Sequence, residues 1–175
     1  MNTNYTNNKR EQGFSLIELI LYVGLAAVMI LAVSVFLSAI LQSKVRSQTV
    51  SEVEGQGVQV MQRILQTIRN SEAINSPGVG LSDSSLSINV LTPALNPTIF
   101  ILSGGVVEMK EGTELSIPLT STRVVVSDLI FRNLSRSETP GIIQVQFTIT
   151  HLNQEGRYEY DYSRVFIGSA TLKAY

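Results

Sequence analysis

The sequence predicts an α+β fold in which a long N-terminal helix is apolar in its first half and packs on an antiparallel β-sheet head through its amphipathic second half. Residues 14–41 form an almost uncharged apolar run, and helical spacing continues beyond it without a proline. From residue 75 onward, short alternating segments are separated by turns rich in glycine and proline. We therefore divide the chain into residues 1–13, 14–41, 42–74 and 75–175.

Composition excludes several classes of function. The 175 residues leave room for one modest domain with a real core. A formal net charge of -1, with no local basic cluster, argues against a nucleic-acid-binding protein. Because the chain has no cysteine, it has no disulfide framework, cysteine-ligated zinc or thiol catalysis.

The apolar run is long enough to cross a membrane. Residues 19–41 contain neither a charge nor a proline, and at about 1.5 Å per helical residue they cover a hydrocarbon core of roughly 30 Å. Lipid requires each segment to satisfy its own backbone groups, so this run is predicted to be a helix. Glu18 is its only charge, and a carboxylate costs about 2.5–3.5 kcal/mol at the bilayer centre and less near an interface.

The helix is predicted to continue to about residue 71 as an amphipathic segment. Gly55 and Gly57 are its weak points, because each costs about 1 kcal/mol against alanine in a helix interior. The apolar positions and threonine that recur at helical spacing are Val45, Thr49, Val53, Val60, Ile64 and Ile68.

The turn at residues 75–80 is predicted to end the helical region, and five to seven antiparallel strands follow it. Gly104-Gly105 is a strong two-residue hairpin signal, while Pro118 restricts its segment to an edge or a strand end. The strand segments are residues 86–90, 98–103, 106–110, 114–119, 123–131, 143–150 and 157–167.

The start of the chain carries a specific motif. A short polar head with Lys9 and Arg10 ends at Gly13, Phe14 follows, and Glu18 is the fifth residue counted from Phe14. This segment resembles the leader of type IV prepilins and type II secretion pseudopilins. The resemblance implies that a membrane peptidase cuts between Gly13 and Phe14 and N-methylates Phe14.

The resemblance also implies a mechanism and a set of partners. Glu18 of an incoming subunit would meet the positive N-terminus of a subunit already in the filament and so set the axial register. The partners would be other pilin or pseudopilin subunits, the prepilin peptidase, the inner-membrane assembly platform, a cytoplasmic ATPase that drives extraction, and membrane lipid before assembly. No cofactor is implied. Pilins and pseudopilins have a lollipop shape, with a long helix and a β-rich head, which agrees with the predicted outline.

The resemblance places the chain in the cytoplasmic membrane, with one pass and the head outside the cytoplasm, before it enters a pilus or pseudopilus. The absence of a cysteine pair near the C-terminus favours a minor subunit. Whether the filament serves secretion, adhesion, motility or DNA uptake is left open by the sequence.

Three other readings compete with a filament subunit. A cleaved secretory signal is disfavoured because the apolar run is too long and lacks a polar break. An uncleaved signal anchor carrying an extracytoplasmic ligand-binding domain is the main alternative; Lys9 and Arg10 favour it, while Lys44 and Arg46 weaken its charge asymmetry. An enzyme is least favoured, because no catalytic constellation emerges.

The late part of the chain offers weaker candidates. His151, the single histidine, is predicted to end a strand rather than act as a base. Tyr158, Tyr160 and Tyr162 alternate with acidic residues, which predicts a stripe on one strand face. Core or subunit packing is favoured for this stripe over a ligand-binding face. Calcium binding by the intervening Glu159 and Asp161 is weakly supported, and no metal site is predicted.

Overall fold

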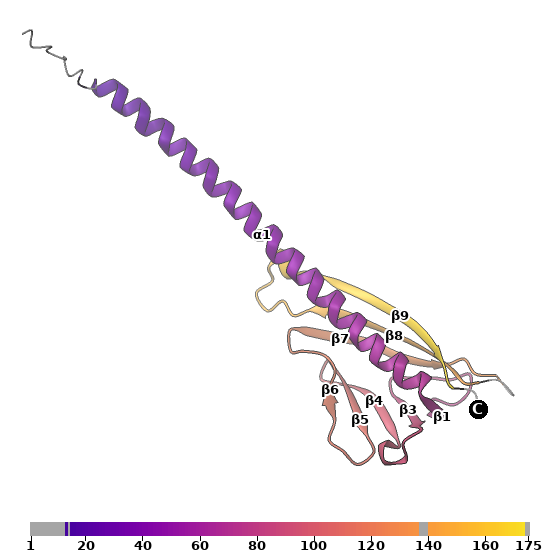
Figure 1. Ribbon diagram of the computed structural model, residues 1–175. Coiled ribbons are helices and arrows are strands. Elements are labelled where there is room, and N and C mark those ends of the chain that lie inside the picture. The colour runs from indigo at the N-terminus through magenta and orange to yellow at the C-terminus, as the bar shows by residue number, and fades with distance from the viewer. Residues whose placement is uncertain (1–12, 14, 137–139, 174–175) are drawn as a thin grey trace, which may run out of the picture. The chain divides into compact units, whose positions relative to one another are not determined.

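The computed structural model describes residues 13, 15–136 and 140–173. The chain divides into two compact units, Met1–Gln42 and Ser43–Tyr175. Helix α1 (Leu16–Arg69) contributes to both units, so the predicted long helix is present (Figure 1). It is the one helix in the described part of the chain that is long and apolar enough to cross a membrane.

In the second unit, α1 has one buried face. This face consists of Thr49, Val53, Gly57, Val60, Met61, Ile64 and Ile68. Apart from the adjacent Val60 and Met61, these positions follow one another at spacings of three or four residues, so the amphipathic prediction is confirmed. The helix ends at Arg69, earlier than predicted, and the Ser71 hydroxyl donates to the Ile68 carbonyl at 2.6 Å.

Nine strands in the described residues form two antiparallel sheets, where the sequence predicted one sheet of five to seven strands. The five-stranded sheet has the order β1-β3-β4-β5-β6 and the four-stranded sheet the order β2-β7-β8-β9. The strands of the first sheet are β1 (Ser71–Ser76), β3 (Leu86–Val90), β4 (Thr98–Ser103), β5 (Val106–Glu111) and β6 (Ile117–Pro118). The strands of the second sheet are β2 (Ser82–Asp83), β7 (Val124–Asn133), β8 (Ile142–His151) and β9 (Ser163–Thr171).

Several strands differ from the prediction. Residues 71–76 were predicted to lie in the helix and its terminal turn, but β1 pairs with β3 across two register shifts. The strand predicted over residues 114–119 is reduced to β6, whose Pro118 lies at the sheet edge as its missing amide requires. The last strand begins at Ser163 rather than at residue 157, because a short 3-10 helix, η2 (Tyr158–Tyr160), precedes it. A second 3-10 helix, η1 (Pro93–Leu95), lies between β3 and β4.

A backbone hydrogen bond joins the two sheets. The β4–β5 hairpin turns at Gly104-Gly105, as predicted, and the amide of Val126 donates to the Gly105 carbonyl at 2.8 Å. Gly105 has φ +80°, and an added β-carbon would lie 2.9 Å from the Val125 side chain. Glycine is required here by both backbone conformation and space.

One hydrophobic core lies between α1 and the two sheets. Its fully buried members come from all three elements and include Ile64 of α1, Phe100 of β4 and Phe147 of β8. Burying each such side chain contributes about 1.5–3 kcal/mol. Figure 1 shows α1 crossing the sheets in this unit, and the α+β prediction of a helix packed on an antiparallel head is confirmed.

Candidate functional site

The predicted processing site precedes the first turn of α1. Gly13 is exposed, and a β-carbon built there meets no atom within 4 Å. Phe14 lies outside the described residues. The structure therefore places Gly13 on accessible backbone just before Ser15 and the start of the helix.

Ser15 and Glu18 form the helix N-terminus. The Glu18 amide donates to Ser15 Oγ at 3.3 Å, which satisfies one of the four amides that lack a partner in the first turn. Ser15 was not predicted as a functional residue, although Ser-x-x-Glu before an apolar run is a capping signal. An acidic residue at this position is also favoured by the helix dipole.

The carboxylate of Glu18 has a local partner one turn further along. The Tyr22 hydroxyl donates to Glu18 Oε1 at 3.2 Å. This hydrogen bond lowers the cost of placing the carboxylate beside apolar residues, but it supplies no opposite charge. Glu18 itself is half-buried.

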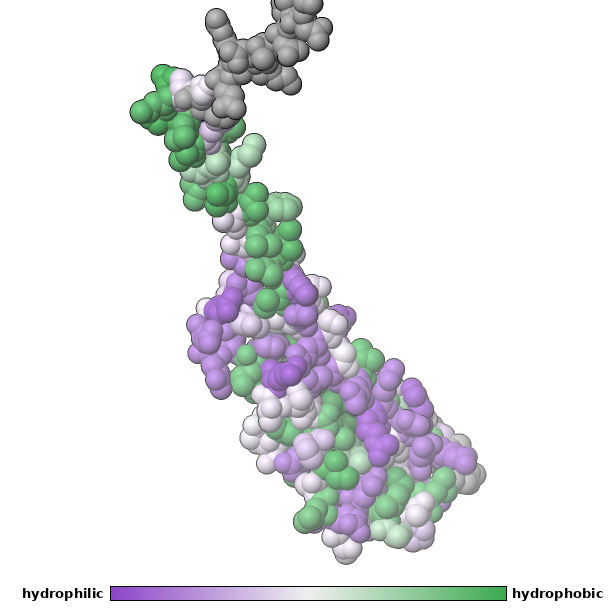
Figure 2. All heavy atoms as spheres, turned by 60° about the vertical axis from the view of Figure 1, so that its left-hand side comes forward, coloured by the Kyte–Doolittle hydropathy of each residue, from purple (hydrophilic) through white to green (hydrophobic). Residues whose placement is uncertain are grey.

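The rest of the first unit presents an apolar surface. Its large aliphatic side chains are mostly more than half exposed, and none of the most apolar window is buried. Figure 2 shows this part of α1 mostly in green on the face in view. Ser34 Oγ donates to the Ile30 carbonyl at 2.8 Å and Ser38 Oγ to the Ser34 carbonyl at 2.9 Å, so both hydroxyl donors are satisfied within the helix as lipid demands.

The three tyrosines do not form the predicted stripe. Tyr158 and Tyr160 lie in η2 and Tyr162 lies in the connection to β9, so strand alternation does not apply to them. The turn before η2 is closed by Asn153, whose side chain accepts from the Arg157 amide and donates to its carbonyl, each at 2.9 Å.

Tyr158 and Tyr162 instead contact side chains of α1 within the second unit. The Arg46 guanidinium lies 4.6 Å from the centre of the exposed Tyr158 ring, a cation–π contact. The Tyr162 hydroxyl donates to Glu54 Oε1 at 2.9 Å, and Arg164 of β9 forms an ion pair with the same oxygen. These contacts hold the segment before β9 against the helix.

The contacts among Glu54, Tyr162 and Arg164 shift the pKa of all three side chains. The Arg164 hydrogen bond, with a second from Tyr162, lowers the pKa of Glu54 below its ordinary 4.5. The same Glu54 carboxylate raises the pKa of the Tyr162 phenol above its ordinary 10.0 and raises that of Arg164. Glu54 therefore stays ionised under mildly acidic conditions.

His151 ends β8, as predicted, and lies beside Tyr160 and close to Glu52 of α1. Its ring stacks on Tyr160 with centroids 5.4 Å apart and planes 12° apart. Its Nε2 lies 3.8 Å from Glu52, which also lies 3.6 Å from Arg123. His151 Nδ1 is buried and has no hydrogen-bond partner among the described residues.

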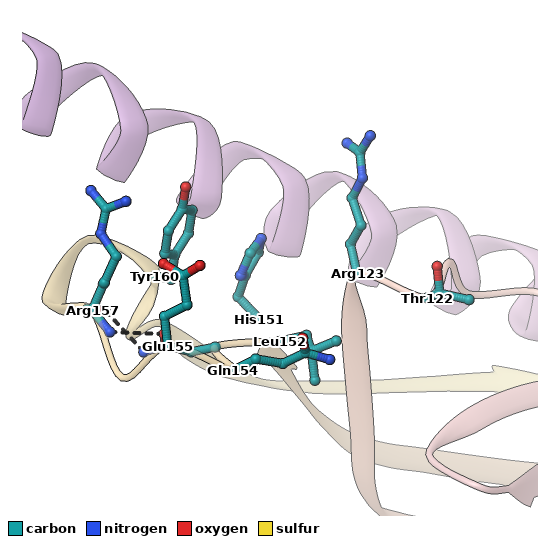
Figure 3. Close-up of a pocket in the computed structure, with 9 residues that line it drawn as sticks. Thr122, Arg123, His151, Leu152, Gln154, Glu155, Arg157 and Tyr160 are labelled. Atoms are coloured by element: carbon teal, nitrogen blue, oxygen red, sulfur yellow. Dashed lines mark hydrogen bonds between the residues drawn. The ribbon is translucent and has the colours of Figure 1, made fainter.

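An open hollow of about 380 Å³ lies beside this histidine. Figure 3 shows His151 and Tyr160 side by side beneath α1, with Arg123 and Arg157 on either side. The lining residues are Thr122, Arg123, His151, Leu152, Asn153, Gln154, Glu155, Arg157 and Tyr160. Its two arginines form ion pairs, Arg123 with Glu52 and Arg157 with Glu159.

One of the two acidic residues considered for calcium, Glu159, is paired with an arginine. A backbone hydrogen bond, and after it the hydrogen bond from Arg157 at 3.3 Å, lowers the pKa of the Glu159 carboxyl below its ordinary value. Within the described ranges, no three histidine, aspartate or glutamate side chains form a group suited to a metal ion.

The pairing of Glu54 with Arg164 was missed from the sequence. The two residues are 110 positions apart, so no local pattern connects them. Glu54 directly follows Val53, a residue of the buried face of α1. It therefore lies at the border of that face, where a charged residue next to the core is expected.

Comparison with protein-family models, curated proteins and solved structures finds no match to this chain. Functional interpretation therefore depends on its own residues, above all those from Gly13 to Glu18 and the apolar helix after them.

Proposed function

We propose that this chain is a structural subunit of a type IV pilus or a type II secretion pseudopilus, cut between Gly13 and Phe14 and assembled through α1. The supporting observation is the order of Gly13, Phe14 and Glu18 immediately before an apolar helix with exposed side chains. A minor subunit is favoured because the chain lacks the C-terminal cysteine pair common in major pilins.

Cleavage would create a positive charge that can pair with the Glu18 carboxylate. A new amino group on Phe14 would lie about one helical turn before Glu18 in the same chain. Each of these charges is costly in lipid unless it is paired, so an ion pair between neighbouring subunits is favoured as the helices pack. The hydrogen bond from the Tyr22 hydroxyl would stabilise the Glu18 carboxylate before that ion pair forms.

The partners in this proposal follow from the same chemistry. The exposed apolar helix would reside in membrane lipid before assembly and contact other pilin or pseudopilin helices afterwards. The second unit would lie outside the cytoplasm, with the prepilin peptidase and assembly platform acting at the cytoplasmic membrane. The role is mechanical, and no catalytic step is assigned to the chain.

The test is peptidase-dependent entry into filaments. The full chain is expressed with its host's peptidase and assembly machinery, and filaments are sheared from cells and probed for it. We expect the processed chain in the filament fraction, and we expect deletion of the peptidase to leave the longer chain in membranes. A processed chain confined to membranes when other subunits form filaments would contradict the assembly role.

The hollow beside His151 favours a second candidate, an uncleaved anchored domain that binds a ligand. Its support is the buried Nδ1 of His151, which has no hydrogen-bond partner among the described residues, in a residue that lines an open hollow. An intact leader in cells with active peptidase would favour this candidate over a filament subunit.

A further inference from the structure

The side of β9 that faces away from β8 is a long, regular strand edge in the second unit. β9 lies at the end of its sheet, and among the described residues no strand pairs with its other side. It runs for nine residues, and its pairing with β8 is continuous without a register shift. Such an edge presents a row of backbone donors and acceptors at strand spacing.

The backbone hydrogen bonds show which groups point outward. The Leu172 amide donates to Gly141 at 2.8 Å, and the Tyr162 carbonyl accepts from His151 at 3.0 Å. Even-numbered residues in this register therefore bond to β8. The odd-numbered backbone groups point away from the sheet, and the next odd amide, that of Lys173, donates to Ser71 in β1.

The other sheet edges are blunted in the ways that natural proteins use to prevent pairing. Strands β2 and β6 are two residues long, and β6 contains Pro118. Strand β1 has two register shifts and carries Glu72. Strand β9 has none of these devices, since it contains no proline or lysine and its single charge, Arg164, is directed to Glu54 of α1.

Apart from Arg164, the exposed side chains of β9 are apolar or uncharged. Val165 is 52% exposed and Ile167 62% exposed, and the other outward residues of β9 are serine and threonine. On the helix side, Leu65 lies over β9, because a β-carbon at Gly168 would be 3.1 Å from Leu65 Cδ1. Val58, seven residues earlier on the same helix flank, is 45% exposed.

We propose that the β9 edge receives an extended strand from a neighbouring pilin-type subunit, adding a fifth strand to the four-stranded sheet. An extended strand is the occupant that matches a repeating row of outward amides and carbonyls. Its inner side chains would contact Val58 and Leu65, and an uncharged outer face would match Val165 and Ile167. This inference rests on the proposed function, because it names a contact within the filament.

Hydrogen exchange distinguishes the outward amides from the inward ones. The full chain is compared in detergent and in isolated filaments, with residue-level exchange measured by fragmentation mass spectrometry. In detergent, the amides of Val165, Ile167 and Ser169 should exchange fast, while those of Phe166 and Gly168 are protected. In filaments, the three outward amides should slow by roughly tenfold or more.

A pair of variants tests the same edge in cells. Ile167→Pro removes an outward amide without removing a bond to β8, and Ile167→Thr retains the amide as a matched control. We expect roughly tenfold less Ile167→Pro in filaments and near-normal Ile167→Thr. Val165→Lys places a charge on the edge but keeps every amide, and it should reduce incorporation to a similar extent. It serves as the test if Ile167→Pro does not fold.

The outcomes separate this inference from the proposed function. If the wild-type chain is in filaments but its outward β9 amides exchange as fast as in detergent, the inference is overturned and the filament role stands. If folded Ile167→Pro and Val165→Lys both enter filaments normally, the inference is likewise overturned. Absence of the wild-type chain from the host's filaments overturns both.

Discussion

Gly57 of α1 lies directly against the ring of Phe166 in β9, so closely that a β-carbon at residue 57 would overlap the ring. Phe166 in turn stacks on Phe147 of β8, with ring centroids 5.5 Å apart. The glycine that looks like a weak point in the helix sequence is therefore the residue that leaves space for the Phe166 ring against the helix.

Gly57→Ala should destabilise the second unit although alanine is the better helix former. The new methyl group has to displace Phe166, and overpacking of this kind costs about 1–3 kcal/mol. Urea titration of the full chain in detergent measures the free energy of unfolding that tests this prediction.

Gly55→Ala is the matched control for that prediction. A β-carbon at residue 55 meets nothing within 4 Å, so this change should stabilise the helix by up to about 1 kcal/mol. Equal effects of the two substitutions would show that packing against Phe166 is not what requires glycine.

Glu18→Ala should leave membrane insertion and cleavage largely intact and lower incorporation into filaments by roughly tenfold or more, because the subunit N-terminus would lose its partner in an apolar environment. The amount of processed chain in sheared filaments, relative to membranes, measures this.

Tyr22→Phe separates the charge of Glu18 from its local hydrogen bond. The variant keeps the carboxylate and removes the hydroxyl that donates to it. We expect near-normal incorporation. A defect as large as that of Glu18→Ala would assign the effect to the local bond rather than to the charge.

Stability should fall in acid partly through Glu54. Its pKa is lowered in the folded state by Arg164 and then Tyr162, so its contribution is present above the unfolded value of about 4.5 and is lost as the pH drops below that value. Unfolding midpoints from pH 3 to 7 should show a steeper loss for the wild type than for Glu54→Gln. Parallel curves for the two proteins would contradict this role.

The elements with strong local signals were predictable. The Gly104-Gly105 turn, the alternation of β8 and the spacing of the buried face of α1 each depend on neighbours in sequence. Their local preferences agree with the fold, so pattern and structure coincide.

The elements that depend on distant partners were not predictable. β1 has a mostly polar sequence and forms a strand because β3 lies beside it. The alternating tyrosines resemble a strand, but the Asn153 turn and the stacking of Tyr160 on His151 hold them in a different conformation. The Glu54–Arg164 pair likewise depends on tertiary approach.

The most direct test is the mass of the N-terminal peptide of the protein recovered from membranes of cells with an active prepilin peptidase. Our account predicts a chain that begins at N-methylated Phe14, and it predicts that a bulkier residue in place of Gly13 leaves the full leader attached. A wild-type chain that still begins at Met1 in those cells would contradict processing and favour the anchored binding domain.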